Sequence, residues 1–177
     1  MQPQIAILGW GSLLWEVRRE FDEWHDNWRL DGPSLKLEFS RISSTRLGAL
    51  TLVVDPEHGA PTRVAWCLSK RNDPHDAVAD LRCREGCPIR YIAQMNMFAI
   101  AHDQSSAHEG ANEITTWAHA RGLDVVVWTA LASNFTTKTK KPFCIQEAID
   151  YLRELEPSEG QSGGIHLAIS RVRPHSS

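Results

Sequence analysis

The sequence predicts an α+β fold, and the order of its strand-like and helix-like segments supports that class. Runs typical of strands occupy 49–54, 64–68 and 124–131. Segments typical of helices occupy 76–86 and 145–152. Successive strand-like runs with short turns between them, such as the turn 55–59, favour an antiparallel sheet.

The first element is an apolar run at 5–8 that ends abruptly at Gly9 and Gly11. This pattern predicts a strand that enters a tight loop, because glycine has no Cβ to oppose a sharp turn. Apolar residues then recur at three- and four-residue steps through 17–28, and charged residues fill the opposite side. We therefore expect an amphipathic helix or a helical excursion there, with its tryptophans in the core.

The middle of the chain mixes strands and helices. Alternating apolar and polar residues predict a strand at 35–39. The segment Asn72-Asp73-Pro74 offers an N-cap and a first-turn proline, and Gly86 supplies a stop, so we predict a helix between them. A further strand is expected at 90–100, and a short helix at 113–121 before Gly122.

The last part of the chain contains a predicted helix at 144–155, which stops before Pro157. The glycine-rich segment 160–164 is interpreted as a flexible turn, and the alternating tail 165–169 as a closing strand. No internal repeat is present. A length of 177 residues, with 42% hydrophobic and 23% charged residues, is typical of one globular domain over 1–177.

Charge and hydropathy exclude several classes of partner. The net charge of −3 gives no electrostatic reason to expect nucleic acid, and the basic cluster 138–141 is interpreted as a solvated loop. No apolar run approaches the ~18 residues of a membrane helix, and the first residues do not resemble a signal peptide. We therefore expect a cytoplasmic protein with no nucleic-acid partner and no membrane partner.

The loop after the first strand is a candidate anion site, because successive backbone N–H groups at a tight turn can hold a carboxylate. Known glycine-rich motifs do not match it. Leu14 stands where a dinucleotide fingerprint needs its third glycine, and no Gly-Lys-Ser/Thr follows as in a P-loop. Ser12 is not a nucleophile elbow, because Trp10 and Leu14 occupy the positions where that motif has glycine.

The segment Trp10-Gly11-Ser12-Leu13 resembles the Tyr-Gly-Ser-Leu loop of the gamma-glutamyl cyclotransferase-like family. The segment 76–86 is similar to the family's helix that ends in an acidic residue followed by glycine, here Glu85 and Gly86. The strand 124–131 and the helix 145–152 also follow in the family's order. The resemblance implies a small mixed, mostly antiparallel barrel-like sheet flanked by helices.

The resemblance also implies a reaction. A small-molecule γ-glutamyl amine or peptide would be converted to 5-oxoproline and a free amine by intramolecular aminoacyl transfer. Glu85 would be the catalytic general acid/base, and the segment Trp10, Gly11, Ser12 and Leu13 would bind the substrate's α-carboxylate. Since the nucleophile belongs to the substrate, this reaction needs no metal and no cofactor. The identity of the leaving group and the oligomeric state are not predicted.

Alternatives remain open at this point. Taken alone, Glu85 is interpreted as a solvated residue paired with a neighbouring arginine. The chain is alternatively a non-catalytic member of the same fold that binds a small metabolite or a protein. Trp10 departs from the family's tyrosine and offers only an N–H donor, which puts any role of that hydroxyl in question.

Other reactive residues give weaker signals. Arg41 and Arg46 follow a strand and could bind a substrate carboxylate with two hydrogen bonds each, although exposed arginines at strand ends are usually solvated. Cys83 and Cys87 lie four residues apart, so a redox pair is the minor alternative to reduced thiols. The eight histidines are scattered, and even the closest pair, His102 and His108, is better explained as surface residues than as metal ligands.

Overall fold

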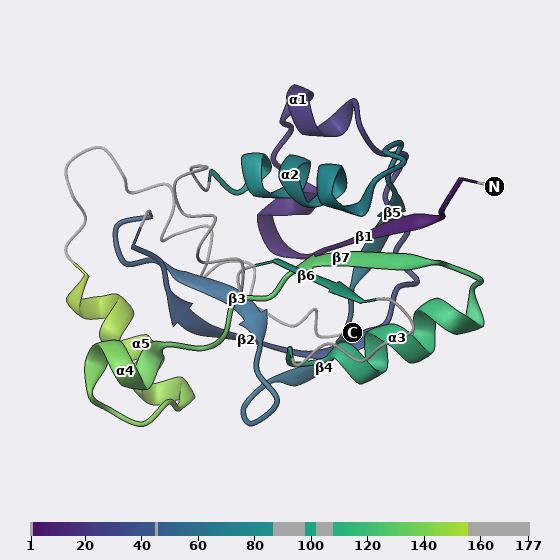
Figure 1. Cartoon of the computed structure of the whole chain (residues 1–177). Helices are drawn as coiled ribbons and strands as arrows, with labels where there is room; N and C mark the ends of the chain where they lie inside the picture. Colours follow the sequence, from purple (N-terminus) through teal and green to yellow (C-terminus); the bar gives the residue numbers. More distant parts are fainter. Residues whose placement is uncertain (1, 45, 87–97, 102–107, 156–177) are drawn as a thin grey trace, which may run out of the picture.

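The computed structural model describes residues 2–44, 46–86, 98–101 and 108–155 (Figure 1). It confirms a mixed α+β architecture in which most strand pairs are antiparallel. The strands are β1 (Ile5–Gly9), β2 (Ser34–Ile42), β3 (Leu50–Val54), β4 (Ala60–Arg63), β5 (Ala65–Leu68), β6 (Phe98–Ala101) and β7 (Val125–Thr129). The helices are the 3-10 turn η1 (Gly11–Leu14), α1 (Arg19–Asp22), α2 (Pro74–Arg84), α3 (Ala111–Ala120), α4 (Phe135–Thr139) and α5 (Ile145–Glu154).

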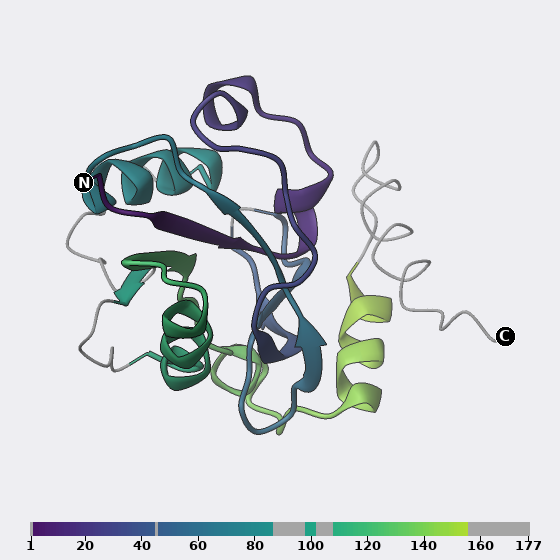
Figure 2. The ribbon, with the colours of Figure 1, turned by 90° about the vertical axis from the view of Figure 1, so that its right-hand side faces the viewer.

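The first sheet has the strand order β5-β1-β7-β6, with β1 parallel to β7 and the other pairs antiparallel. Side chains alternate across β1. Ile5 and Ile7 pack with residues of α1 and α2, while Ala6 and Leu8 pack with residues of α3 and of the second sheet. Figures 1 and 2 show α2 and α3 on opposite sides of β1 and β7, so both faces of this sheet are covered.

The second sheet has the order β3-β2-β4 and is continuous with the first through one segment of chain. Only Val64 separates β4 from β5, and its N–H donates to the carbonyl of Pro33 at 3.0 Å while its own carbonyl accepts from Gly32 at 3.1 Å. One extended segment thus passes from one sheet to the other. Among the described strands these two open sheets do not close, so the single barrel-like sheet implied by the resemblance is not seen.

Of the two alternatives predicted at 17–28, a helix or a helical excursion, the structure has the shorter one, since α1 is only Arg19–Asp22. Beyond it the chain is extended along β5: the N–H of Asp26 donates to Leu68 at 2.9 Å, and that of Arg29 donates to Trp66 at 2.8 Å. These bonds hold the chain along β5 and prevent a longer helix. Trp24 is accordingly 39% exposed beneath the Arg71 guanidinium instead of in the core.

Three of the later helices, α2, α3 and α5, agree with the sequence, whereas α4 lies in a segment for which no helix is expected. Asp73 caps α2, because its carboxylate accepts from the N–H of His75 at 2.8 Å, and Gly86 follows the helix with a φ of +69°. α3 and α5 lie where helices are expected at 113–121 and 144–155. The segments 90–97 and 165–169, for which strands are expected, lie outside the described residues.

A third apolar cluster joins α4 and α5 to the end of the second sheet. Asn134 fixes this junction, since its Oδ1 accepts from the N–H of Ile42 at 2.7 Å and its Nδ2 donates to the carbonyl of Ile42 at 3.1 Å. The Asn134 side chain therefore forms hydrogen bonds with the backbone of β2 as a neighbouring strand would. Its loss would leave both backbone groups of Ile42 without these partners.

We expect Asn134→Ala to lower the free energy of unfolding by about 1–3 kcal/mol, because a buried donor and acceptor lose their partners. Asn72→Ala, at an exposed position before α2, is the matched control and should change it by less than about 0.5 kcal/mol. Urea denaturation of both variants measures the difference. Equal stability of the two variants would contradict this role of Asn134.

Candidate functional site

The predicted binding loop begins where β1 ends. Gly9 lies against an indole ring, and a Cβ at this position would be 2.5 Å from Cη2 of Trp28. Trp10 donates its indole N–H to the carbonyl of Leu52 in β3 at 3.0 Å, which ties the loop to the second sheet. Gly11 then turns the chain with a φ of +59°, a value that disfavours other residues.

The four predicted loop residues have different environments. Leu13 is buried in the cluster beneath α2, so it anchors the loop through packing. Ser12 is half-buried, and its hydroxyl oxygen accepts a hydrogen bond from Nη2 of Arg46 at 3.1 Å. Its carbonyl accepts from the N–H of Glu16 at 3.0 Å. The hydroxyl of Ser12 therefore lies at a polar contact between the loop and Arg46.

Arg84, in the last turn of α2, joins that helix to the loop. Its Nη2 donates to the carbonyls of Ser12 at 2.9 Å and Glu16 at 3.1 Å, and lies 3.7 Å from Oε2 of Glu16. The arginine is only 3% exposed. Within the described residues, its Nε and Nη1 are buried without a hydrogen-bond partner. A buried guanidinium thus fixes the loop backbone against the end of α2.

Glu85 follows Arg84 directly and forms the C-cap of α2, with its N–H bonded to the carbonyl of Leu81 at 3.0 Å. The bond between Arg84 and Ser12 therefore brings the predicted catalytic carboxylate to the same part of the molecule as the predicted binding loop. Glu85 is half-buried. Within the described residues, no hydrogen bond or ion pair occupies its carboxylate.

The surroundings of Glu85 affect its protonation in opposing ways. Burial raises the pKa of Glu85 by penalising the ionised carboxylate, and this effect prevails. The positive charges of Arg84, Arg46 and Arg18 act in the other direction, while the negative charge of Glu16 adds to the increase. A carboxylate with a raised pKa accepts and returns protons nearer to neutral pH than an exposed glutamate does.

Arg46 and Arg84 belong to this site, and Arg41 does not. Arg41 donates to the carbonyl of Ala132 at 2.7 Å, in the segment that leads to α4. The sequence contained a signal for Arg84, because it shares the helical spacing of Ala77 and Leu81, which are the other buried residues of α2. An arginine at an apolar position of a helix indicates a specific buried partner.

The structure also locates several of the cysteines and histidines that the sequence offered as alternative sites. Burial raises the pKa of the Cys67 thiol, whereas Cys83 and Cys144 are exposed free thiols and Cys87 lies outside the described residues. His102 also lies outside them. Within the described residues, no group of three or more His, Cys, Asp or Glu side chains is arranged to hold a metal ion. Two surface hollows lie elsewhere, one beside α3 and one beside the start of β1.

Comparisons with protein-family models, with curated proteins and with solved structures found no match to this chain. In the described part of the chain, no helix has both the length and the apolar character needed to cross a membrane. The functional argument therefore depends on the residues of the site.

We expect Arg84→Met to loosen the loop, because the carbonyl of Ser12 would lose the donor that holds it to α2. Loss of a charge-assisted hydrogen bond of this kind should speed hydrogen exchange at the Glu16 amide by roughly 10-fold or more. Arg82→Met, on the same helix, is the control and should leave that exchange unchanged. Unchanged protection in Arg84→Met would show that Arg84 does not hold the loop.

Proposed function

We propose that the protein is a gamma-glutamyl cyclotransferase-like enzyme that converts a small γ-glutamyl amine or peptide to 5-oxoproline and a free amine. The observation that carries the proposal is the hydrogen bond from Arg84 to the carbonyl of Ser12. It brings together the two segments on which the family resemblance rests, the loop 10–13 and the acidic residue Glu85 before Gly86.

The proposed chemistry needs one proton-transferring group. The α-amino nitrogen of the substrate attacks its own γ-carbonyl carbon, the new C–N bond closes a five-membered ring, and the original amide C–N bond breaks. Glu85 accepts the proton that the ammonium loses and returns a proton to the departing amine. Its raised pKa favours both steps, because the carboxylate is a stronger base than an exposed one and the acid form is populated nearer to neutral pH.

In this proposal the loop binds the substrate, whereas Glu85 transfers the protons. The hydroxyl of Ser12 and the backbone of the turn at Gly11 would hold the α-carboxylate, which places the α-amino group next to Glu85. Trp10 donates its N–H to Leu52, so in this chain it fixes the loop where the family has a tyrosine. The proposal also includes the family's barrel-like fold, although the described strands form two open sheets joined by the segment from β4 to β5.

The proposed substrate is a small cytoplasmic metabolite, and no nucleic acid or membrane enters the proposal. Cleavage of a γ-glutamyl bond by its own amine needs no cofactor and no metal. The main alternative, a non-catalytic protein of the same fold, would use the loop in the same way but would release no product.

We expect Glu85→Gln to lower the rate constant kcat for 5-oxoproline release by about 10²- to 10⁴-fold, because the amide cannot carry the proton. Release from a panel of γ-glutamyl compounds is measured by mass spectrometry, with Glu20→Gln at an exposed position as the control. Since burial penalises the charge of Glu85, the neutral variant should unfold at neutral pH no more easily than wild type.

Undiminished turnover in a folded Glu85→Gln would exclude Glu85 as the acid/base. Stabilisation of wild type by these compounds without product would favour the non-catalytic alternative.

The pH dependence of kcat/KM should respond to the charges around Glu85. The acid limb should lie above the pH expected for an ordinary glutamate, because burial raises the Glu85 pKa. Arg18→Gln removes a charge that lowers this pKa and should move the limb to higher pH, whereas Glu16→Gln removes a charge that raises it and should move the limb to lower pH. Profiles measured at constant ionic strength test both signs. Shifts in the same direction would contradict the assignment of the limb to Glu85.

A further inference from the structure

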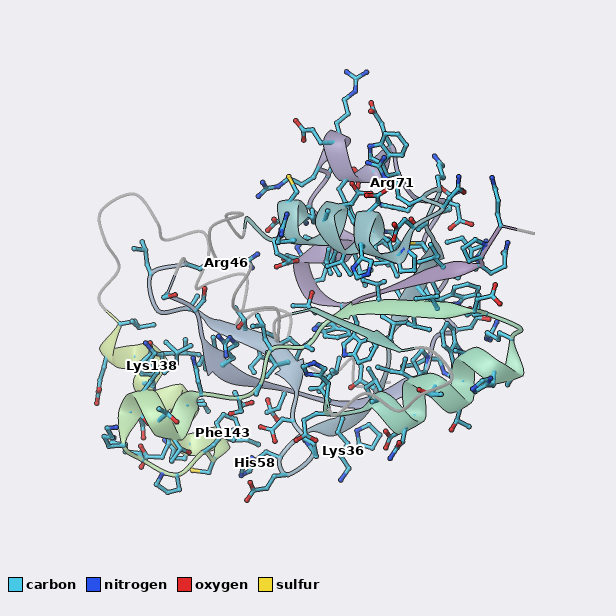
Figure 3. The ribbon with its side chains drawn as sticks, viewed as in Figure 1. Lys36, Arg46, His58, Arg71, Lys138 and Phe143 are labelled. Carbon is cyan, nitrogen blue, oxygen red and sulfur yellow. The ribbon has the colours of Figure 1, made fainter. Side chains whose placement is uncertain are left out.

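Arg46 reaches the site from the second sheet, in the turn between β2 and β3. Its N–H donates to Oγ of Ser43 at 3.2 Å, and its carbonyl accepts from the N–H of Ala49 at 3.0 Å. The turn is also braced by α5, since the hydroxyl of Tyr151 donates to the carbonyl of Gly48 at 2.8 Å. Arg46 thus extends from a turn that is fixed on both sides. Its side chain is labelled in Figure 3.

The contact between Arg46 and Ser12 determines what kind of ligand suits the loop. Arg46 has only donors, so the Ser12 hydroxyl oxygen must be the acceptor of this bond, and the hydroxyl hydrogen points elsewhere. Within the described residues, the side chain of Arg46 makes no other hydrogen bond. Both groups therefore present unused donors at one place, which suits a ligand group that only accepts, such as a carboxylate.

The charges nearby match both ends of an α-amino acid. Arg84 lies beneath the loop as a buried positive charge, and Nη2 of Arg46 is beside Ser12, so an anion is favoured at the loop. Glu85, within electrostatic range of both arginines, favours a cation beside it. A free α-carboxylate and an α-ammonium on the same carbon would satisfy both positions together.

We propose that Arg46, together with Ser12, binds the α-carboxylate of the γ-glutamyl group, and that this contact makes a free α-carboxylate a requirement for good substrates. The identity of the ligand in this inference rests on the proposed function. The carboxylate is then held by a charged partner from the second sheet as well as by the loop of the first. Arg46 acts in binding, and Glu85 remains the group that moves protons.

The test pairs an enzyme variant with a substrate change. Arg46→Gln and wild type are assayed on one γ-glutamyl compound with a free α-carboxylate and on its α-carboxamide. We expect Arg46→Gln to raise KM for the carboxylate by about 10- to 100-fold, with a smaller change in kcat, and to change KM for the carboxamide by less than about twofold. Arg153→Gln is the matched control, because Arg153 is exposed on α5 and pairs with Asp150.

The outcomes separate this inference from the proposed function. If wild type releases 5-oxoproline but Arg46→Gln keeps the same preference for the carboxylate, the inference is overturned and the function stands. If wild type releases no product, the function fails, and calorimetric binding of glutamate and of its α-amide to both proteins tests Arg46 directly. Weaker binding of glutamate alone by Arg46→Gln would then support the inference, and equal binding by the two proteins would overturn it.

Discussion

The site depends on one buried positive charge. Desolvation of a guanidinium is costly unless its N–H groups find acceptors, and Nη2 of Arg84 finds them in the carbonyls of Ser12 and Glu16. The chain after β1 must therefore follow the end of α2. Because the residue that follows Arg84 is Glu85, the bond from Nη2 of Arg84 to Ser12 also brings the Glu85 carboxylate to the same part of the molecule as the loop.

Local sequence signals predicted the elements whose ends are chemically marked. Asp73, Pro74 and Gly86 delimit α2, and the abrupt change at Gly9 marks the end of β1. At 17–28 the helix is shorter than the periodic pattern, because backbone pairing with β5 overrides helical periodicity. Such pairing joins segments about forty positions apart, and a local sequence pattern cannot predict it.

The candidate site likewise combines residues that local sequence patterns predicted with contacts that only the tertiary fold provides. The loop and Glu85 were visible as short motifs, whereas their contact depends on Arg84, whose buried position only the helical spacing indicates. Arg46 was recognisable as a strand-end arginine, but its bond to Ser12 spans 34 positions and could not be derived from spacing. Arg41, with an equal signal in the sequence, is instead used to hold the segment before α4. Sequence patterns identified the candidate groups, and the tertiary fold selected among them.

The turn that carries Arg46 is supported by Tyr151, which lies 103 positions away from Gly48 in the chain. In the proposed reaction the acid/base residue therefore follows α2, whereas the contribution of Arg46 to binding depends on the β2–β3 turn and on α5. Because the charge of Arg46 also lowers the pKa of Glu85, a change in α5 that loosens this turn would, in the proposed enzyme, alter carboxylate binding and proton transfer together. A helix that contributes neither proposed group to the site could therefore still tune both.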